Sequence, residues 1–155
     1  MKRNLLRVAA VAAFAIGLLA LSASAQTVTG SLGKVTKGKP VRATVYLNLP
    51  AGLHANSHSP GNEYQIPTTV RVTSVRGVRV GAVSYPRGVN KKFGFSETPI
   101  NVYQGRVAFG FTVTVPASFS GNTVRVTVSV KYQACTDEVC YAPKTKTVTL
   151  NATVQ

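Results

Sequence analysis

Acidic residues are scarce in this sequence, and their scarcity excludes most hydrolytic enzymes. Its 155 residues contain only four carboxylates, Glu63, Glu97, Asp137 and Glu138. A glycosidase needs two carboxylates that face each other across a sugar, and the adjacent side chains of Asp137 and Glu138 would point apart on an extended backbone. The sequence also lacks a Gly-x-Ser-x-Gly nucleophile motif and a glycine-rich phosphate-binding loop. We therefore expect no hydrolase site.

Long apolar runs are also missing, apart from one near the start. Residues 1–25 combine a basic beginning, an apolar stretch over 8–21 and an Ala-Ser-Ala sequence at 23–25, the pattern of a signal peptide. The 14-residue stretch is shorter than the roughly 20 residues that span a bilayer, which argues against an uncleaved anchor. We expect cleavage before Gln26, no stable membrane insertion afterwards, and a periplasmic or otherwise extracytoplasmic domain over 26–155.

Negative charge is low enough to leave the exported part strongly basic. After residue 25 there are 15 Lys and Arg against 4 Asp and Glu, a formal charge of +11. The cations are scattered singly along strand-like segments, which is more typical of a solvated face than of a nucleic-acid-binding stripe. We expect no nucleic-acid partner, while attraction to an acidic protein or an anionic envelope surface stays open.

Apolar and polar residues alternate with a period of two along most of 26–155, which predicts strands with one buried face. The clearest segments are 40–49, 106–115, 123–132 and 146–154, and shorter candidates are 27–32, 68–75 and 78–84. Short turn sequences such as "KGKP" and "FSGN" separate them. The residues expected to point inward are Val41, Ala43, Val45, Leu47, Leu49, Val107, Phe109, Phe111, Val113, Val115, Val124, Val126, Val128, Val130, Tyr132, Val148, Leu150, Ala152 and Val154.

About seven such strands in 130 residues predict a single all-β domain, an immunoglobulin-like antiparallel β-sandwich. Tryptophan is absent, and the only two cysteines are too close together to bridge two sheets as in antibody domains. The segments 52–67 and 85–103 break the alternation, and we expect them to be long irregular connections. Function often resides in such connections.

The cysteine pair, Cys135 and Cys140, allows three interpretations. A hairpin between the last two long strands would bring the cysteines within bonding distance near its tip. Closing so short a loop contributes roughly 2 kcal/mol in the chain-entropy model, against about 5 kcal/mol for a loop of 100 residues. This favours a redox-active pair, which exchange partners could reach at an exposed tip, over a structural disulfide. A Cys₂His₂ metal site with His54 and His58 is the third possibility, although these histidines are also compatible with ordinary loop positions.

The segment "YQACTDEVCYAPKTKTVTL" resembles the cysteine segment of the periplasmic N-terminal domain of the thiol-disulfide interchange protein DsbD. Two further segments, "GLHANSHSPGNEYQIPTTVRV" and "KKFGFSETPINVY", are similar to other parts of that domain, the second to its cap loop. The resemblance covers most of 26–155. This chain departs from the common pattern by having one residue fewer between its cysteines.

The resemblance implies an immunoglobulin-like domain that passes reducing equivalents, without a bound cofactor, between a membrane electron donor and thioredoxin-like partners, including cytochrome c maturation factors. Cys135 and Cys140 would form the redox disulfide, and Cys140 would bond to the partner. Phe93 and Phe95 would belong to a cap that shields the disulfide, with Tyr132 and Tyr141 packing nearby. Ordinary core or hairpin packing is the alternative for these four aromatic residues.

The sequence to Gln155 contains neither membrane helices nor a thioredoxin-like domain, so we expect a free-standing carrier that receives its electrons from separate proteins. The alternative function is a non-catalytic envelope binding or scaffolding module with a structural disulfide.

Overall fold

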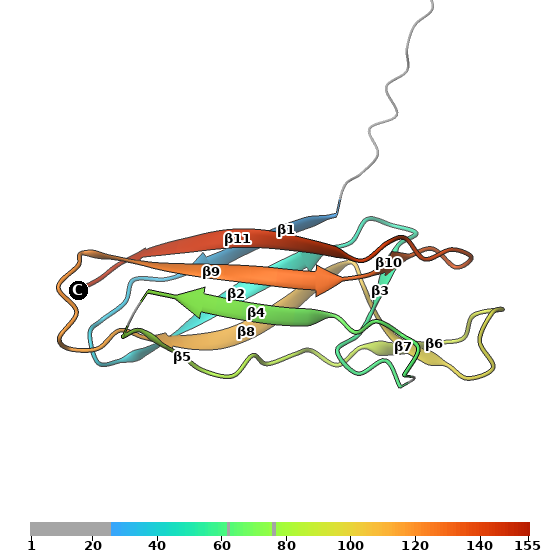
Figure 1. Cartoon of the computed structure of the whole chain (residues 1–155), viewed down its shortest axis with the longest axis horizontal. Helices are drawn as coiled ribbons and strands as arrows, with labels where there is room; N and C mark the ends of the chain where they lie inside the picture. The colour runs from blue at the N-terminus through green and yellow to red at the C-terminus, as the bar shows by residue number, and fades with distance from the viewer. Residues whose placement is uncertain (1–25, 62, 76) are drawn as a thin grey trace, which may run out of the picture.

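The computed structural model describes residues 26–61, 63–75 and 77–155, and the predicted signal peptide lies outside them. The described chain folds into strands joined by turns and loops (Figure 1). The strands are β1 (Thr27–Leu32), β2 (Pro40–Asn48), β3 (His54–Asn56), β4 (Thr69–Ser74), β5 (Arg79–Val80), β6 (Val89–Lys91), β7 (Ile100–Gln104), β8 (Arg106–Thr114), β9 (Thr123–Tyr132), β10 (Ala134–Cys135) and β11 (Lys144–Thr153).

Seven of these strands form two sheets that enclose a common core. One sheet has the order β1-β2-β8-β5 and the other β11-β9-β4, and neighbouring strands are antiparallel. This division and order match the ABED and GFC sheets of a constant-type immunoglobulin domain, with β1, β2, β4, β5, β8, β9 and β11 as strands A to G. The predicted immunoglobulin-like β-sandwich is therefore confirmed.

The alternation in the sequence decides which residues form the core. In β9, every second side chain from Val124 to Tyr132 is fully buried. In β8, the predicted inward residues from Val107 to Val113 are buried, as is Val115 just after the strand. Of the 19 residues predicted to point inward, only Val41 and Val148 are partly rather than fully buried. Burial of these β-branched and aromatic side chains between the two sheets is the main stabilising contribution to the fold.

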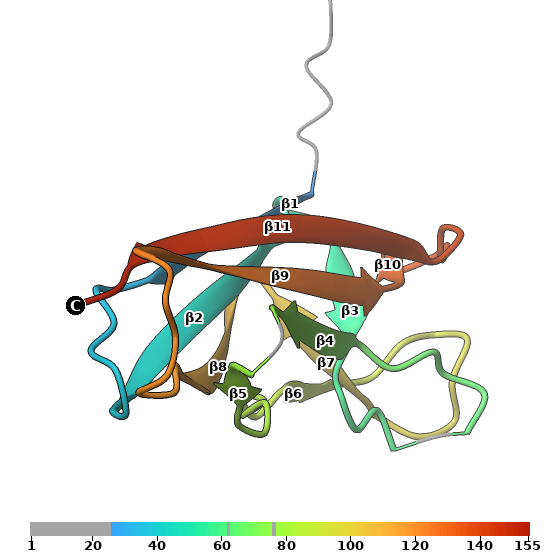
Figure 2. The same cartoon turned by 60° about the vertical axis from the view of Figure 1, so that its left-hand side comes forward.

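A third, small sheet with the order β10-β3-β7-β6 lies at one end of the sandwich, away from the C-terminus (Figures 1 and 2). Its strands come from three connections of the sandwich: B–C supplies β3, D–E supplies β6 and β7, and F–G supplies β10. Glycines with positive φ occur where the chain passes between the sheets, Gly52 (φ 80°) between β2 and β3 and Gly105 (φ 63°) between β7 and β8. Glycine adopts this backbone conformation without the penalty of a Cβ atom.

The small sheet corrects the prediction that 52–67 and 85–103 are wholly irregular, because these segments contain β3, β6 and most of β7. The three-residue strands β3 and β6 are too short to show a period in the sequence, and β7 does not alternate, because Val102 and Tyr103 are both buried. The predicted strand at 78–84 is also wrong in extent. Only Arg79–Val80 forms β5, although the chain continues beside β8 through backbone hydrogen bonds from the N–H groups of Gly81 and Ser84 to Thr112 and Gly110.

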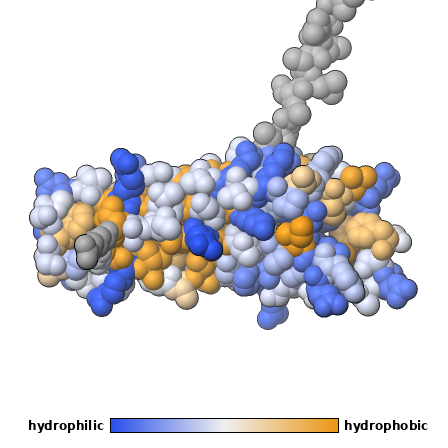
Figure 3. Space-filling model, viewed as in Figure 1, coloured by the Kyte–Doolittle hydropathy of each residue, from blue (hydrophilic) through white to orange (hydrophobic). Residues whose placement is uncertain are grey.

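On the face of the domain shown in Figure 3, hydrophilic side chains lie singly or in small groups among apolar ones. Within the described ranges, no helix is both long and apolar enough to cross a membrane.

Candidate functional site

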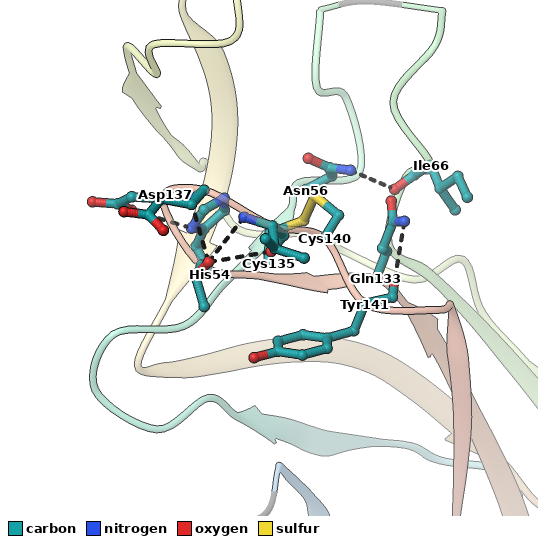
Figure 4. The surroundings of a disulfide bond; sticks show 11 residues. His54, Asn56, Ile66, Gln133, Cys135, Asp137, Cys140 and Tyr141 are labelled. Atoms are coloured by element: carbon teal, nitrogen blue, oxygen red, sulfur yellow. Dashed lines mark hydrogen bonds and ion pairs between the residues drawn. A yellow bond between two sulfur atoms is a disulfide. The ribbon is translucent and has the colours of Figure 1, made fainter.

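Cys135 and Cys140 form a disulfide at the tip of the hairpin between β9 and β11, with their Cα atoms 4.0 Å apart (Figure 4). The four residues between them make a tight turn, in which the N–H of Thr136 donates to the carbonyl of Val139 at 2.8 Å. The hydroxyl oxygen of Thr136 accepts hydrogen bonds from the N–H groups of Glu138 and Val139, at 3.2 and 3.0 Å. Serine and threonine commonly stabilise turns in this way. We call residues 135–140 the cysteine loop.

The two cysteines have different surroundings. Cys135 ends β10 and pairs with His54 of β3, and only 1% of its surface is exposed. Cys140 lies on the returning side of the loop and is exposed. The next residue, Tyr141, donates its N–H to the carbonyl of Ala134 at 2.9 Å, which ties the returning chain to β10. An attacking thiolate from another molecule can therefore approach Cys140 more easily than Cys135.

A buried histidine and two charged groups flank Cys135. His54 is 2% exposed, and its Nδ1 lies 3.8 Å from Oδ1 of Asp137 in the cysteine loop. The same carboxylate oxygen accepts a hydrogen bond from Nζ of Lys91, at the end of β6, at 2.7 Å. Three connections of the sandwich thus meet at Asp137, which Figure 4 shows beside His54.

These contacts change the acid–base properties of both groups. Burial lowers the pKa of His54, the Lys91 cation lowers it further, and the Asp137 carboxylate partly opposes them. The pKa of Asp137 is lowered chiefly by the hydrogen bond from Lys91. Near neutral pH, His54 is therefore an uncharged imidazole, and Asp137 is an ionised carboxylate.

The segment between β6 and β7 places aromatic rings against this histidine. Phe93 is 4% exposed and stacks on the His54 ring, with centroids 4.5 Å apart and planes inclined by 24°. The Phe95 ring in turn stacks on Phe93, with ring centroids 5.2 Å apart, but 53% of the surface of Phe95 is exposed. Phe93 also packs in a small apolar cluster with Ile100 and Val102. We call residues 92–99 the cap segment.

The two tyrosines named in the sequence analysis differ in position. Tyr132 is fully buried in the main core of the sandwich, and burial raises the pKa of its phenol. Tyr141 follows Cys140 and is 48% exposed, and its carbonyl accepts a hydrogen bond from the side-chain amide of Gln133 at 3.1 Å. Tyr132 thus has an ordinary core position, whereas Tyr141 lies on the surface next to the exposed cysteine.

The structure does not assemble the Cys₂His₂ set considered from the sequence. His58 stacks on Tyr85 at 3.6 Å, and its Nδ1 lies 3.1 Å from the carbonyl oxygen of Thr68. His54 has the different neighbours described above. Among the residues that the structure describes, no three His, Cys, Asp or Glu side chains form a group that could hold a metal ion.

Sequence reasoning missed Lys91 and did not connect His54 with Asp137. Residues 54 and 137 belong to connections far apart in the chain, and only the pairing of β3 with β10 brings them together. No local pattern could have revealed this contact.

Comparison with known proteins identifies a family. The model of the family described as "Thiol:disulfide interchange protein DsbD, N-terminal" matches residues 25–152. No curated protein matches the sequence.

Solved structures with similar folds include the reduced N-terminal domain of DsbD from Neisseria meningitidis, which is 17% identical, with a TM-score of 0.45 over 73% of this chain and 82% of that one. The N-terminal periplasmic domain of ScsB from Proteus mirabilis is also 17% identical, with a TM-score of 0.48 over 81% of this chain and 44% of that one. The collagen-binding subdomain of the Enterococcus faecalis surface protein ACE is 9% identical, with a TM-score of 0.43 over 81% and 95%. With all three scores below 0.5, the family assignment rests on the family model.

Proposed function

Because the chain belongs to the family of DsbD N-terminal domains, whose general chemistry is thiol–disulfide exchange, we propose that it passes reducing equivalents between thioredoxin-like partners through Cys135 and Cys140. The observation that carries this proposal is the asymmetry of the disulfide, which joins a buried cysteine to an exposed one at the end of the sandwich. A partner can reach one sulfur while the fold retains the other.

In the reductive direction, a partner thiolate attacks Sγ of Cys140. The Cys135–Cys140 bond breaks, and its electron pair leaves on Cys135 as a thiolate. The partner's second thiolate then attacks the partner sulfur of the mixed disulfide, and Cys140 leaves as a thiolate. The domain has gained two electrons, and the partner has been oxidised to a disulfide. The reverse sequence reduces an acceptor disulfide, so the domain needs no bound cofactor.

The proposed setting is the periplasm, reached after removal of residues 1–25 as a signal peptide. In this setting a membrane protein would supply electrons, and oxidised thioredoxin-like proteins, such as those of cytochrome c maturation, would receive them. The +11 charge of residues 26–155 supports attraction to acidic partner surfaces.

We assign a shielding role to the cap segment. Lys91, immediately before it, hydrogen-bonds to Asp137 inside the cysteine loop, while Phe93 stacks on the histidine that pairs with Cys135. These two contacts hold the cap segment against the end of the sandwich that carries the disulfide. Phe95 and Tyr141 are exposed there and provide apolar surface for a docking partner.

Replacing Lys91 with Ala should loosen the cap segment and speed reduction of the disulfide by dithiothreitol. Because an exposed ion pair contributes little to stability, the expected gain in rate is up to about fivefold. The measurement is the rate of thiol release under pseudo-first-order conditions. Lys92→Ala is the matched control, since it removes the same charge from an exposed neighbour. Equal rates for the two variants would show that the Lys91–Asp137 contact does not restrain the cap segment.

The reduction potential of the cysteine pair tests the proposed function. Residues 26–155 are equilibrated with glutathione or dithiothreitol buffers, and free thiols are counted by mass spectrometry. We expect a midpoint between about −180 and −270 mV, the range between protein disulfide isomerase and thioredoxin. A midpoint below about −300 mV is typical of a structural disulfide. That result would refute the carrier function and leave the non-catalytic binding or scaffolding module.

A further inference from the structure

The burial of Cys135 creates a chemical difficulty for a domain that donates electrons. After Cys140 of the reduced domain has attacked a partner disulfide, Cys135 must attack Sγ of Cys140 to release the partner. Only a thiolate is an effective nucleophile in this step. Cys135 is 1% exposed, and burial raises the pKa of a thiol by disfavouring its charged form. The step therefore needs a group that removes the proton inside the protein.

His54 is placed to be that group. It is the register partner of Cys135 in the antiparallel pair β3–β10, and partners in such a pair project from the same face of the sheet with Cβ atoms about 4.5–5.5 Å apart. Stacking on Phe93 restrains the imidazole ring, and Asp137 lies 3.8 Å from its Nδ1. Figure 4 shows His54 and Asp137 grouped beside Cys135. A cysteine, a histidine and a carboxylate are thereby brought together.

We propose that His54, supported by Asp137, is the general base that activates Cys135 for release of the partner. This inference rests on the proposed function and adds a residue to its mechanism. The imidazole takes the proton of the Cys135 thiol, and the resulting thiolate attacks Sγ of Cys140 in the mixed disulfide. The Cys135–Cys140 bond forms as the Cys140–partner bond breaks, and the electron pair leaves on the partner's sulfur as a thiolate. The proton on His54 is afterwards lost to solvent or to that thiolate.

The charges around His54 suit this role. Asp137 from the cysteine loop and Lys91 from β6 are the charged groups that act on it. Its register partner in β7, Gln104, is uncharged, and the cap segment contributes the ring of Phe93. Burial and Lys91 keep the imidazole neutral and ready to accept a proton near pH 7. Asp137 then stabilises the imidazolium that forms, as a carboxylate does in other histidine-based sites.

The test uses oxidised glutathione as the partner disulfide and follows release of glutathione from Cys140. The reduced domain is mixed with it, the reaction is quenched with acid, and the glutathionylated intermediate is quantified by mass spectrometry. We expect His54→Gln to slow release of glutathione by about 100-fold, at the lower end of general-base effects, so that the intermediate accumulates. His58→Gln is the matched control and should release glutathione at the wild-type rate. Equal release rates for His54→Gln and the wild type would overturn the proposal.

The pH profile separates this role from a structural one. In the wild type, release should slow as the pH falls through the pKa of His54, because the protonated imidazole accepts no proton. Asp137 raises that pKa and Lys91 lowers it. Asp137→Asn should therefore move the fall in rate to lower pH, and Lys91→Ala should move it to higher pH. Both variants lose the ion pair between Lys91 and Asp137. If His54 had only a structural role, loosening of the cap segment would shift the two pH profiles in the same direction or leave both unchanged. Either result would contradict the proposal.

Failure of this inference can be distinguished from failure of the proposed function. The release rate is measured on the chemically reduced protein, whatever the midpoint potential. A potential below about −300 mV would refute the carrier function, whereas unchanged release in His54→Gln would refute only the role of the histidine.

Discussion

Replacing Cys135 with Ala leaves a domain that can be trapped on its partner, whereas replacing Cys140 with Ala removes the accessible thiol. In the first variant, exposed Cys140 should react with a disulfide probe and stay in the mixed disulfide, since the domain then has no second thiol that could displace the probe. In the second, the remaining thiol belongs to Cys135, which is 1% exposed. We expect the probe to react about 100-fold more slowly with it, because exchange requires access to the sulfur.

The measurement is the rate of reaction with 5,5′-dithiobis(2-nitrobenzoate), followed by absorbance. A thioredoxin-like protein that lacks its second cysteine is then added, and its remaining thiolate displaces thionitrobenzoate from the labelled domain and is captured in a mixed disulfide. Reaction rates in denaturant provide the control, and they should be similar for the two variants once the fold is lost. Faster reaction of the Cys135 thiol in the native state would reverse the assigned order of attack. Capture of the partner through both cysteines equally would contradict the asymmetry on which the proposed function depends.

Replacing Phe109 with Ala should lower the free energy of unfolding by about 3–5 kcal/mol, the usual cost of removing a buried phenylalanine ring. Phe109 is fully buried in β8. Its ring meets Tyr85 and Tyr103 edge-on, with centroids 5.6 and 5.9 Å apart. The cavity left by alanine would lie between the sandwich and the tyrosines of the D–E connection. The loss of stability should therefore exceed the loss expected from the cavity alone, because the two edge-on ring contacts are also removed.

Urea unfolding, followed by circular dichroism, measures this loss. Phe95→Ala is the matched control, because Phe95 is 53% exposed. In the described part of the chain, its ring stacks on Phe93 and on no other aromatic ring. We expect it to change stability by no more than about 0.5 kcal/mol. A loss below about 1 kcal/mol for Phe109→Ala would mean that the core around β8 is not packed as described.

The sequence was informative wherever structure depends on neighbouring residues. In β9, the alternation from Val124 to Tyr132 predicted which side chains are buried, because a strand that packs on one face buries every second residue. The turn sequences divided the chain into the strands of the sandwich. The predicted extent of β5 was wrong, because residues 81–84 make only scattered backbone hydrogen bonds to β8.

The site was less predictable, because its residues meet through pairing between distant connections. The spacing of Cys135 and Cys140 suggested a hairpin disulfide, and the structure contains it. The resemblance to DsbD domains named Phe93, but not its stacking on His54. From the sequence, His54 could be either a metal ligand or an ordinary loop residue, since nothing near it in the chain identifies Asp137 or Lys91 as neighbours.

The ten-residue ladder between β9 and β11 ends at the pair Tyr132 and Lys144, so the hairpin is already held together by hydrogen bonds before the disulfide closes it. In a thermodynamic cycle, the free energy by which the disulfide stabilises the fold equals the free energy by which the fold stabilises the disulfide. If loop closure gives the fold about 2 kcal/mol, the fold can lower the potential of the pair by only about 45 mV, at 30 mV per 1.4 kcal/mol. The sandwich can therefore alternate between its two oxidation states with little mechanical consequence, and tuning of the potential is left to the side chains that touch the cysteine loop.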